Sequence, residues 1–321
     1  MAETIIEPIE KYGLRQQARP TVLFSKIGIV GCGTVGQELA ITTSKHGIEV
    51  IFLELSEQLI RHSFDEIRKE LDKQINHWGL TSNEKTIILS RIKGTLSYED
   101  FHDCELVVEA IKSKQRESRL EIRKEVFKNI EKHVSKECII ATNSSTLVIT
   151  EMSSELEHNE RCVSLHISVT APGASVVEVA KGLHTSDEAY EKVMKFVKLL
   201  DKIAIPVTES PGLISVRLFV VFLNEACETL MEGVSSMEHI DQTMRHCFNM
   251  PLGPFEFADK VGLDKVLRWT ENLYSEFGLS RYIASPMIKK LARANRLGRL
   301  TGAGFYEYDS EGNKIVEDTC C

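Results

Sequence analysis

Apolar residues in the first two-thirds of the chain form short runs, and segments with helical spacing lie between several of these runs. A short apolar run is typical of a strand that is buried on both faces of a sheet. Strands are predicted at 26–30, 49–53, 91–95, 106–110, 138–142, 162–166, 176–180 and 203–207. The alternation predicts an α/β fold built on a Rossmann-type, doubly wound and mostly parallel sheet.

Two helices are indicated between the second and third predicted strands. Residues 58–78 have an amphipathic pattern, and Thr81 followed by Glu84 is the signature of a capping box that opens another helix.

Only helical periods appear from Thr208 to Arg299. Ser210 and Pro211 are typical of a helix start, and the segment 213–231 is apolar nearly all round, as in the central helix of a bundle or dimer interface. The predicted parts are an N-terminal extension over 1–25, a nucleotide-binding Rossmann domain over 26–207 and a smaller all-helical domain over 208–321.

The glycine-rich turn after the first predicted strand is the strongest chemical signal. Gly31 permits a tight turn, Gly33 lets the backbone approach a pyrophosphate, and Gly36 lets the next helix pack on the strand. The helix N-terminus then offers N–H groups to phosphate. Glu54 ends the second strand, where an acid accepts ribose hydroxyls and repels a 2′-phosphate, so the cofactor is predicted to be NAD. The alternative is a glycine turn in an unrelated βαβ unit.

Composition narrows the class of protein. The 321 residues, 42% hydrophobic and 27% charged, suit a soluble protein of about two domains. A net charge of −8 gives no reason to expect nucleic-acid binding. No apolar stretch approaches the 18 or so residues of a membrane span, and residues 1–20 lack the apolar core of a secretory signal. The eight scattered cysteines, without Cys-x-x-Cys spacing, indicate a reduced cytoplasmic protein with no metal site.

A histidine and an acid stand out within later strands. His166 ends the sixth predicted strand, where open α/β sheets place their ligands. Glu178 lies inside an apolar strand, where a carboxylate is costly unless paired. If the two strands are neighbours, Glu178 accepts the Nδ1–H of His166 and leaves Nε2 as a base. The alternatives are a core histidine and an outward-facing acid on an edge strand.

The hydroxyl-rich segment 142–146 follows the fifth predicted strand. It lies at another strand C-terminus, at the edge of the sheet where ligands bind. The alternative is that its hydroxyl groups cap a helix.

These motifs together resemble the L-3-hydroxyacyl-CoA dehydrogenases over residues 26 to about 308. That superfamily also includes 3-hydroxybutyryl-CoA dehydrogenases, carnitine dehydrogenase and λ-crystallin-type L-gulonate dehydrogenases. The motifs are GCGTVG (31–36) with Glu54, LVVEA (106–110), ATNSSTL (141–147), His166 with VVEV (176–179), PGLISVRL (211–218), LNEA (223–226), PLGPFEFADKVGLD (251–264) and GRLTGAGFYEY (298–308).

The resemblance implies roles for individual residues. His166 would be the general base, Glu178 its partner, and Ser145 the donor to the substrate 3-oxygen. The helical domain would bind acyl-CoA and form a homodimer. The residues implied at the cofactor are Gly31, Gly33, Thr34, Val35, Gly36, Glu54, Glu109 and Asn143.

The chain also departs from the family pattern. Val169 and Val216 replace two family asparagines, one of which points an amide at the reacting oxygen. Loss of one such donor typically costs about 3–4 kcal/mol of transition-state stabilisation. The candidate replacements are Ser168, Thr170 and Ser215, and the alternative is a different substrate.

Residues 111–116 stand where the family has a Glu-Asn stretch, and the segment 112–116 within them is basic. Its Lys114 is a candidate contact for CoA phosphates, and the alternative is an exposed helix face.

The leading hypothesis is an NAD-dependent dehydrogenase of short L-3-hydroxyacyl-CoA substrates, such as 3-hydroxybutyryl-CoA. The alternatives are a dehydrogenase of a small free 3-hydroxy acid, of the carnitine or gulonate type, and a nucleotide-binding homologue with little turnover.

Overall fold

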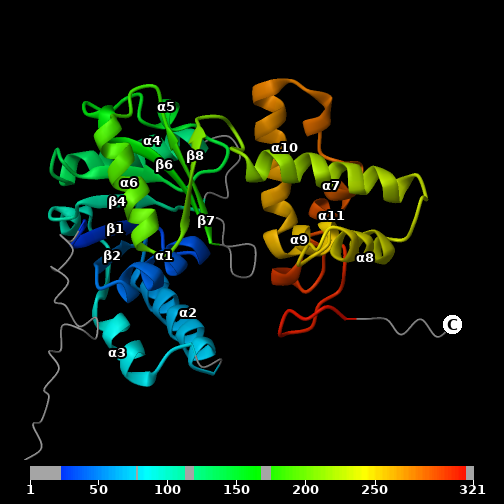
Figure 1. Cartoon of the computed structure of the whole chain (residues 1–321), viewed down its shortest axis with the longest axis horizontal. Helices are drawn as coiled ribbons and strands as arrows, with labels where there is room; N and C mark the ends of the chain where they lie inside the picture. The colour runs from blue at the N-terminus through cyan, green and yellow to red at the C-terminus, as the bar shows by residue number, and fades with distance from the viewer. Residues whose placement is uncertain (1–22, 77–78, 113–118, 168–174, 316–321) are drawn as a thin grey trace, which may run out of the picture.

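The computed structural model describes residues 23–76, 79–112, 119–167 and 175–315, which form a lobe built on a sheet and a helical lobe (Figure 1). Of the predicted extension over 1–25, only residues 23–25 are described.

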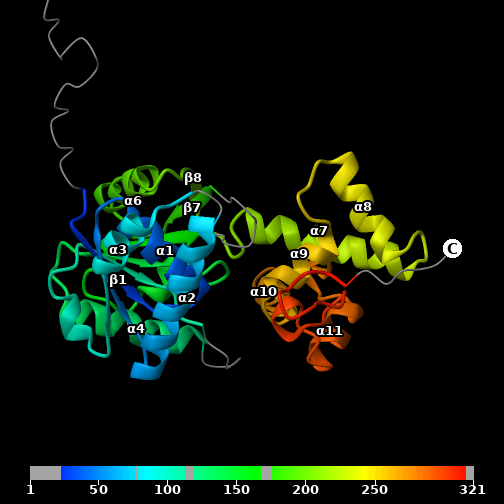
Figure 2. The same ribbon diagram turned by 90° about the horizontal axis from the view of Figure 1, so that it is seen from below.

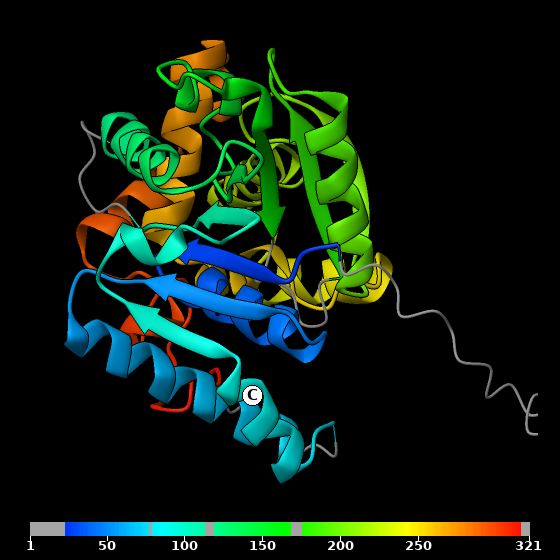
Figure 3. The same ribbon diagram turned by 90° about the vertical axis from the view of Figure 1, so that its left-hand side faces the viewer.

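All eight predicted strands are confirmed, and they form one sheet in the order β3-β2-β1-β4-β5-β6-β7-β8. Every neighbouring pair is parallel except β6 and β7, which are antiparallel. Figure 3 shows the strands fanning through the usual twist. The bounds are β1 Lys26–Val30, β2 Glu49–Leu53, β3 Ile92–Thr95, β4 Leu106–Glu109, β5 Ile139–Thr142, β6 Cys162–Ile167, β7 Val176–Lys181 and β8 Ile203–Thr208.

Helices cover both faces of this sheet, because its strands are apolar on both sides. Leu39, Ile67 and Phe196, from α1, α2 and α6, belong to the core on one face, and Phe127 and Ile130 of α4 belong to the core on the other. The bounds are α1 Thr34–Lys45, α2 Glu57–Asn76, α3 Ser82–Ser90, α4 Arg119–His133, α5 Ile149–Met152 and α6 Asp187–Leu199. Short 3₁₀ turns lie at η2 Tyr98–Phe101 and η3 Asn159–Arg161.

The predicted capping box opens α3. The N–H of Glu84 donates to the hydroxyl of Thr81 at 3.3 Å, and the N–H of Thr81 donates to the Glu84 carboxylate at 2.8 Å. Two otherwise unpaired donors at the helix start are thereby satisfied.

The second lobe is helical, as predicted, and joins the sheet where β8 leads into α7 (Figure 2). Its helices are α7 Ser215–Met231, α8 Met237–Cys247, α9 Pro254–Val261, α10 Leu263–Phe277 and α11 Pro286–Arg293, with 3₁₀ turns at η4 Ser280–Tyr282 and η5 Arg299–Thr301. Within the described part of the chain, no helix is both long enough and apolar enough to cross a bilayer.

A buried acid sets the direction of α9, which forms part of the cleft described below. The carboxylate of Asp241, on α8, accepts the N–H groups of Phe255 and Glu256 at 2.9 and 3.0 Å, and the hydroxyl of Tyr306 at 2.9 Å. The first turn of α9 is therefore capped by a neighbouring helix, since its own N-cap is a glycine.

The predicted start of the long apolar helix at Ser210 and Pro211 was wrong. Gly212 and Leu213 have φ values of +83° and +45°, which no α-helix accommodates, and α7 begins only at Ser215. Residue 214, its N-cap, offers no side-chain hydrogen bond, so the cap comes from elsewhere in the fold.

Candidate active site

The glycine loop between β1 and α1 has the geometry of a dinucleotide cradle. Gly31 has φ +91°, a conformation that favours glycine. A Cβ on Gly36 would lie 2.3 Å from the carbonyl oxygen of Gly31, whereas a Cβ on Gly33 would meet nothing within 4 Å. Space is therefore open above Gly33, beside a helix whose first turn, from Thr34, has no side-chain cap. These residues fit a pyrophosphate group.

Glu54 lies beside this loop. Its Oε1 accepts the N–H of Cys32 at 2.6 Å, which holds the carboxylate at the end of β2. Val35 is half-buried in the first turn of α1 and packs against the core, while Thr34 is exposed. An acid in this position disfavours a 2′-phosphate, and hence NADP.

His166 and Glu178 face each other across β6 and β7. They are paired residues in the antiparallel register, and His166 Nδ1 lies 2.8 Å from Glu178 Oε2. Only 6% of His166 and 4% of Glu178 are exposed. The contact that the sequence predicted is confirmed, because the two strands are neighbours.

The Glu178 carboxylate has further donors from the start of α7. Its Oε1 accepts the N–H groups of residues Ile214 and Ser215, at 2.9 and 3.0 Å, and its Oε2 accepts the Ser215 hydroxyl at 2.7 Å. Burial alone would raise the pKa of Glu178, but the hydrogen bonds from His166 and Ser215 outweigh it and lower the pKa to about 2. The acid is therefore ionised at neutral pH and also caps α7.

The loop after β5 forms hydrogen bonds with both the end of β6 and the helical domain. The Asn143 side chain accepts the N–H of Ile167 at 2.8 Å, directly after His166. The carbonyl of Ser145 accepts the N–H of Gly212 at 2.7 Å. Thr146 next to it accepts a hydrogen bond from Asn272 on α10 at 2.8 Å. Ser145 is thus fixed where the two domains meet.

Glu109, predicted at the cofactor, is fully buried at the end of β4. Its carboxylate is ion-paired with Arg123 and accepts the N–H of Ile111 at 2.8 Å and the Thr142 hydroxyl at 2.7 Å. In this structure Glu109 organises the ends of β4 and β5 from within, and its direct contact with the cofactor stays a prediction.

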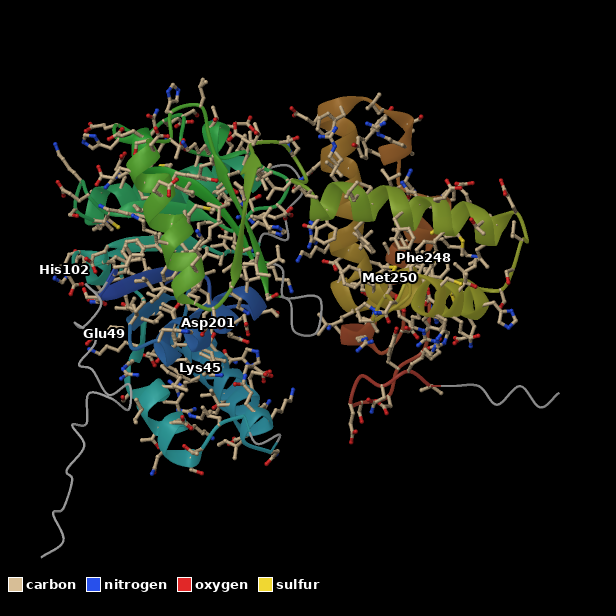
Figure 4. All side chains as sticks on the ribbon, viewed as in Figure 1. Lys45, Glu49, His102, Asp201, Phe248 and Met250 are labelled. Atoms are coloured by element: carbon tan, nitrogen blue, oxygen red, sulfur yellow. The ribbon has the colours of Figure 1, made fainter. Side chains whose placement is uncertain are left out.

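A cleft with an empty volume of about 1050 Å³ lies between the end of β6 and the helical domain. His166, Ser215 and Lys265 are its polar side chains, and Val216 is buried in its wall. Met250, on the loop after α8, also lines it and is labelled on the helical lobe in Figure 4. The aromatic lining residues are Phe219, Phe222, Phe257 and Trp269.

The sequence did not point to Lys265 or to the aromatic walls. Lys265 and Trp269 occupy ordinary positions of an amphipathic helix, and only the packing of α10 against α7 places them in the wall of the cleft that His166 also lines. The sequence offers Ser215 as a replacement donor to the substrate, but in the structure its hydroxyl donates to Glu178. Lys114, Ser168, Val169 and Thr170 lie outside the described residues.

Family models match nearly the whole described chain. The model for the NAD binding domain of 3-hydroxyacyl-CoA dehydrogenase matches residues 26–210, and the model for the C-terminal domain of the same family matches residues 212–308.

Curated relatives and solved structures agree with the family models. The chain is 34% identical over 284 residues to a 3-hydroxybutyryl-CoA dehydrogenase of Clostridioides difficile, which covers 88% of this chain and 99% of the relative. It is 34% identical over 283 residues to a probable 3-hydroxybutyryl-CoA dehydrogenase of Deinococcus radiodurans, covering 88% of this chain and 100% of the relative. The crystal structure of an (S)-3-hydroxybutyryl-CoA dehydrogenase from Ralstonia eutropha has a TM-score of 0.81 and 33% identity, and covers 89% of this chain and 100% of the other.

Proposed function

Because the chain belongs to the 3-hydroxyacyl-CoA dehydrogenase family, whose enzymes use NAD, we propose that it interconverts short L-3-hydroxyacyl-CoA and 3-oxoacyl-CoA, with 3-hydroxybutyryl-CoA as the leading substrate. The observation that carries this proposal is the hydrogen bond between His166 and Glu178 at the wall of the cleft.

His166 is proposed as the general base. With Nδ1–H donated to Glu178, the lone pair of the imidazole is on Nε2, which is then available to take the proton of the substrate hydroxyl. The ionised carboxylate stabilises the imidazolium that results. NAD, when bound, supplies the acceptor for the hydride that leaves C3.

Further residues are proposed to hold the substrate and the cofactor. Ser145 would donate to the 3-oxygen from the loop that Asn143 ties to β6, and Lys114 would contact CoA phosphates. Val216 would face the acyl group as an apolar wall. The cofactor would be held by the glycine loop and Glu54, with Thr34, Val35, Glu109 and Asn143 around it.

Oxidation of NADH in the presence of acetoacetyl-CoA tests this function. Turnover is expected in the wild-type protein and not in His166→Gln, while NADH affinity should be nearly equal in the two. An active His166→Gln enzyme would contradict the role of His166. NADH binding without any turnover of acetoacetyl-CoA would contradict the thioester substrate.

A small free 3-hydroxy acid is the second candidate substrate. It is favoured by Val216, which places an apolar side chain where the family has an amide. A screen of free 3-oxo acids with NADH distinguishes it from the acyl-CoA reaction. NADH binding with no turnover of either class would indicate a nucleotide-binding homologue.

We propose domain boundaries at 26–207 and 208–321, with the helical domain forming a homodimer. Large apolar side chains are exposed on that domain: Leu218 at 67%, Val234 at 69% and Phe248 at 68%.

We also propose a cytoplasmic location, because all six described cysteines are free thiols and five of them are buried.

A further inference from the structure

Lys265 brings a positive charge into the cleft that contains His166. It lies in the first turn of α10, and its Nζ is 5.1 Å from the centre of the Trp269 ring, one turn further along. His166 and Val216 form other parts of the same wall. The ammonium group therefore lies beside an aromatic ring in a cleft that is lined mainly by apolar and aromatic side chains.

In the described part of the chain, Lys265 forms no ion pair with a carboxylate. The nearest acid in sequence, Asp264, is paired with Arg268 at 2.6 Å. Burial, Arg268 and Lys112 lower the pKa of Lys265 to about 8, so the group is mainly a cation at neutral pH. A cation that is partly removed from water without a counterion is costly, and the cation–π contact with Trp269 offsets only part of that cost.

We infer that Lys265 is a specificity-determining residue that binds a carboxylate group of the substrate. A bound carboxylate supplies the missing counterion, through a charge-assisted hydrogen bond. Val216, which lines the same cleft, is apolar and offers no competing polar contact. The same charge disfavours a substrate with a quaternary ammonium group, because like charges repel at close range.

Two substrate classes carry such a carboxylate. One is a 3-oxoacyl-CoA with a terminal carboxylate, and the other is a free 3-oxo acid with its own C1 carboxylate. The inference rests on the proposed function only in assuming that the substrate occupies this cleft.

Matched pairs of substrates separate these classes. 3-Oxoadipyl-CoA and 3-oxohexanoyl-CoA share an acyl chain of equal length and differ in the terminal carboxylate, whereas acetoacetate and methyl acetoacetate differ in the charge at C1. The measured quantity is the ratio of kcat/KM for the charged and uncharged member of each pair. In the pair that belongs to the true substrate class, Lys265→Met should lower this ratio about tenfold to hundredfold. This is the usual effect of losing one charged hydrogen bond.

Two further variants control for charge and packing. Lys265→Arg should retain most of the preference, because it retains the cation. Lys290→Met removes the same charge from an exposed position on α11, outside the cleft, and should leave the ratio as in the wild type. An unchanged ratio in Lys265→Met for both pairs would overturn the inference.

Binding to the NADH complex gives a readout that does not need turnover. The chain has two tryptophans, so Trp78→Phe leaves Trp269, beside Lys265, as the single reporter of fluorescence. Adding acetoacetate or glutarate should change that emission in a saturable way, and the change should be lost when Lys265→Met is added. Dimethyl glutarate is the uncharged control.

The two proposals can fail separately. If no thioester is turned over but the carboxylate response depends on Lys265, the proposed function fails and the role of Lys265 stands. If acetoacetyl-CoA is reduced but neither carboxylate probe gives a response that depends on Lys265, and neither kcat/KM ratio falls, the role of Lys265 is wrong.

Discussion

Ser215 donates both its backbone N–H and its hydroxyl to Glu178, at 3.0 and 2.7 Å, so the acid that binds His166 also caps the first turn of α7. One carboxylate thereby connects the proposed base on the sheet to the helix that carries Val216. The orientation of His166 and the shape of the cleft wall depend on the same buried group.

Glu178→Gln should damage both activity and stability. An amide cannot neutralise the imidazolium form of His166, and one of its ends is a donor that opposes the donors of Ser215. Turnover of acetoacetyl-CoA should fall by about 10³- to 10⁴-fold, as in other dyads that lose their acid. The free energy of unfolding, measured in urea, should fall by about 2–3 kcal/mol.

Ser215→Ala is the matched control for that variant. It removes the hydroxyl donor but leaves the His166 contact and both backbone donors to Glu178. Its loss of activity should be much smaller. If Ser215→Ala were as inactive as Glu178→Gln, the hydroxyl of Ser215 would matter as much to activity as the charge of Glu178, and the contact between His166 and Glu178 alone would not explain the loss.

Acid should weaken the fold through Glu178. Its pKa is about 2 in the folded protein, below the ordinary value of 4.5, so the unfolded chain binds more protons between these two pH values. The stability that this group contributes is therefore complete above about pH 4.5 and is lost as the pH falls toward 2, by up to about 3 kcal/mol. Urea unfolding at several pH values should show a shallower acid dependence for Glu178→Gln than for the wild type. Equal slopes would argue against the assignment.

Two glycines of the cofactor loop should respond in opposite ways to alanine. At Gly33 the new Cβ meets no atom within 4 Å, so Gly33→Ala should fold normally but weaken NADH binding about tenfold or more, because the methyl group lies in the phosphate space. At Gly36 the Cβ would lie 2.3 Å from a backbone oxygen, so Gly36→Ala should lower the melting temperature. Thermal unfolding with and without NADH measures both effects. An unaltered NADH affinity in Gly33→Ala would contradict the proposal that the glycine loop binds the pyrophosphate.

Most of the sheet and the central pair of the site could be predicted from sequence. The strands were visible because each is an apolar run between polar segments, and the pairing of His166 with Glu178 followed once β6 and β7 were neighbours. Effects of long-range packing were not visible. The start of α7 depends on Glu178, which precedes Ser215 by 37 residues, and Lys265 reaches the cleft only through the packing of α10.

The oligomeric state should be a dimer. Leu218 on α7 is exposed but lines the cleft, whereas Val234 and Phe248, elsewhere in the helical lobe, are 69% and 68% exposed, so apolar surface remains uncovered in one chain. Sedimentation at micromolar concentration should give about twice the chain mass of 36.2 kDa. A single species at the mass of one chain would contradict the proposal.

Val216→Asn tests whether this cleft is a weakened or an altered version of the family site. Val216 is 3% exposed and belongs to the apolar core of the helical domain as well as to the cleft wall. The donors of Ser215 beside it are occupied by Glu178. The amide of an asparagine at this position would therefore find no hydrogen-bond partner in Ser215 or in the apolar core. Its remaining partner would be the substrate oxygen, if that oxygen lies within hydrogen-bonding distance.

We expect no gain in the turnover of acetoacetyl-CoA by Val216→Asn and a loss of about 1–3 kcal/mol in the free energy of unfolding, the cost of a buried polar group without a partner. Val216→Ala is the control, because it removes apolar volume without adding a polar atom. If Val216→Asn instead raised turnover tenfold or more while Val216→Ala did not, the amide would be supplying a missing donor to the reacting oxygen. The cleft would then be a weakened acyl-CoA site, and Val216 would no longer favour a free 3-hydroxy acid as the substrate.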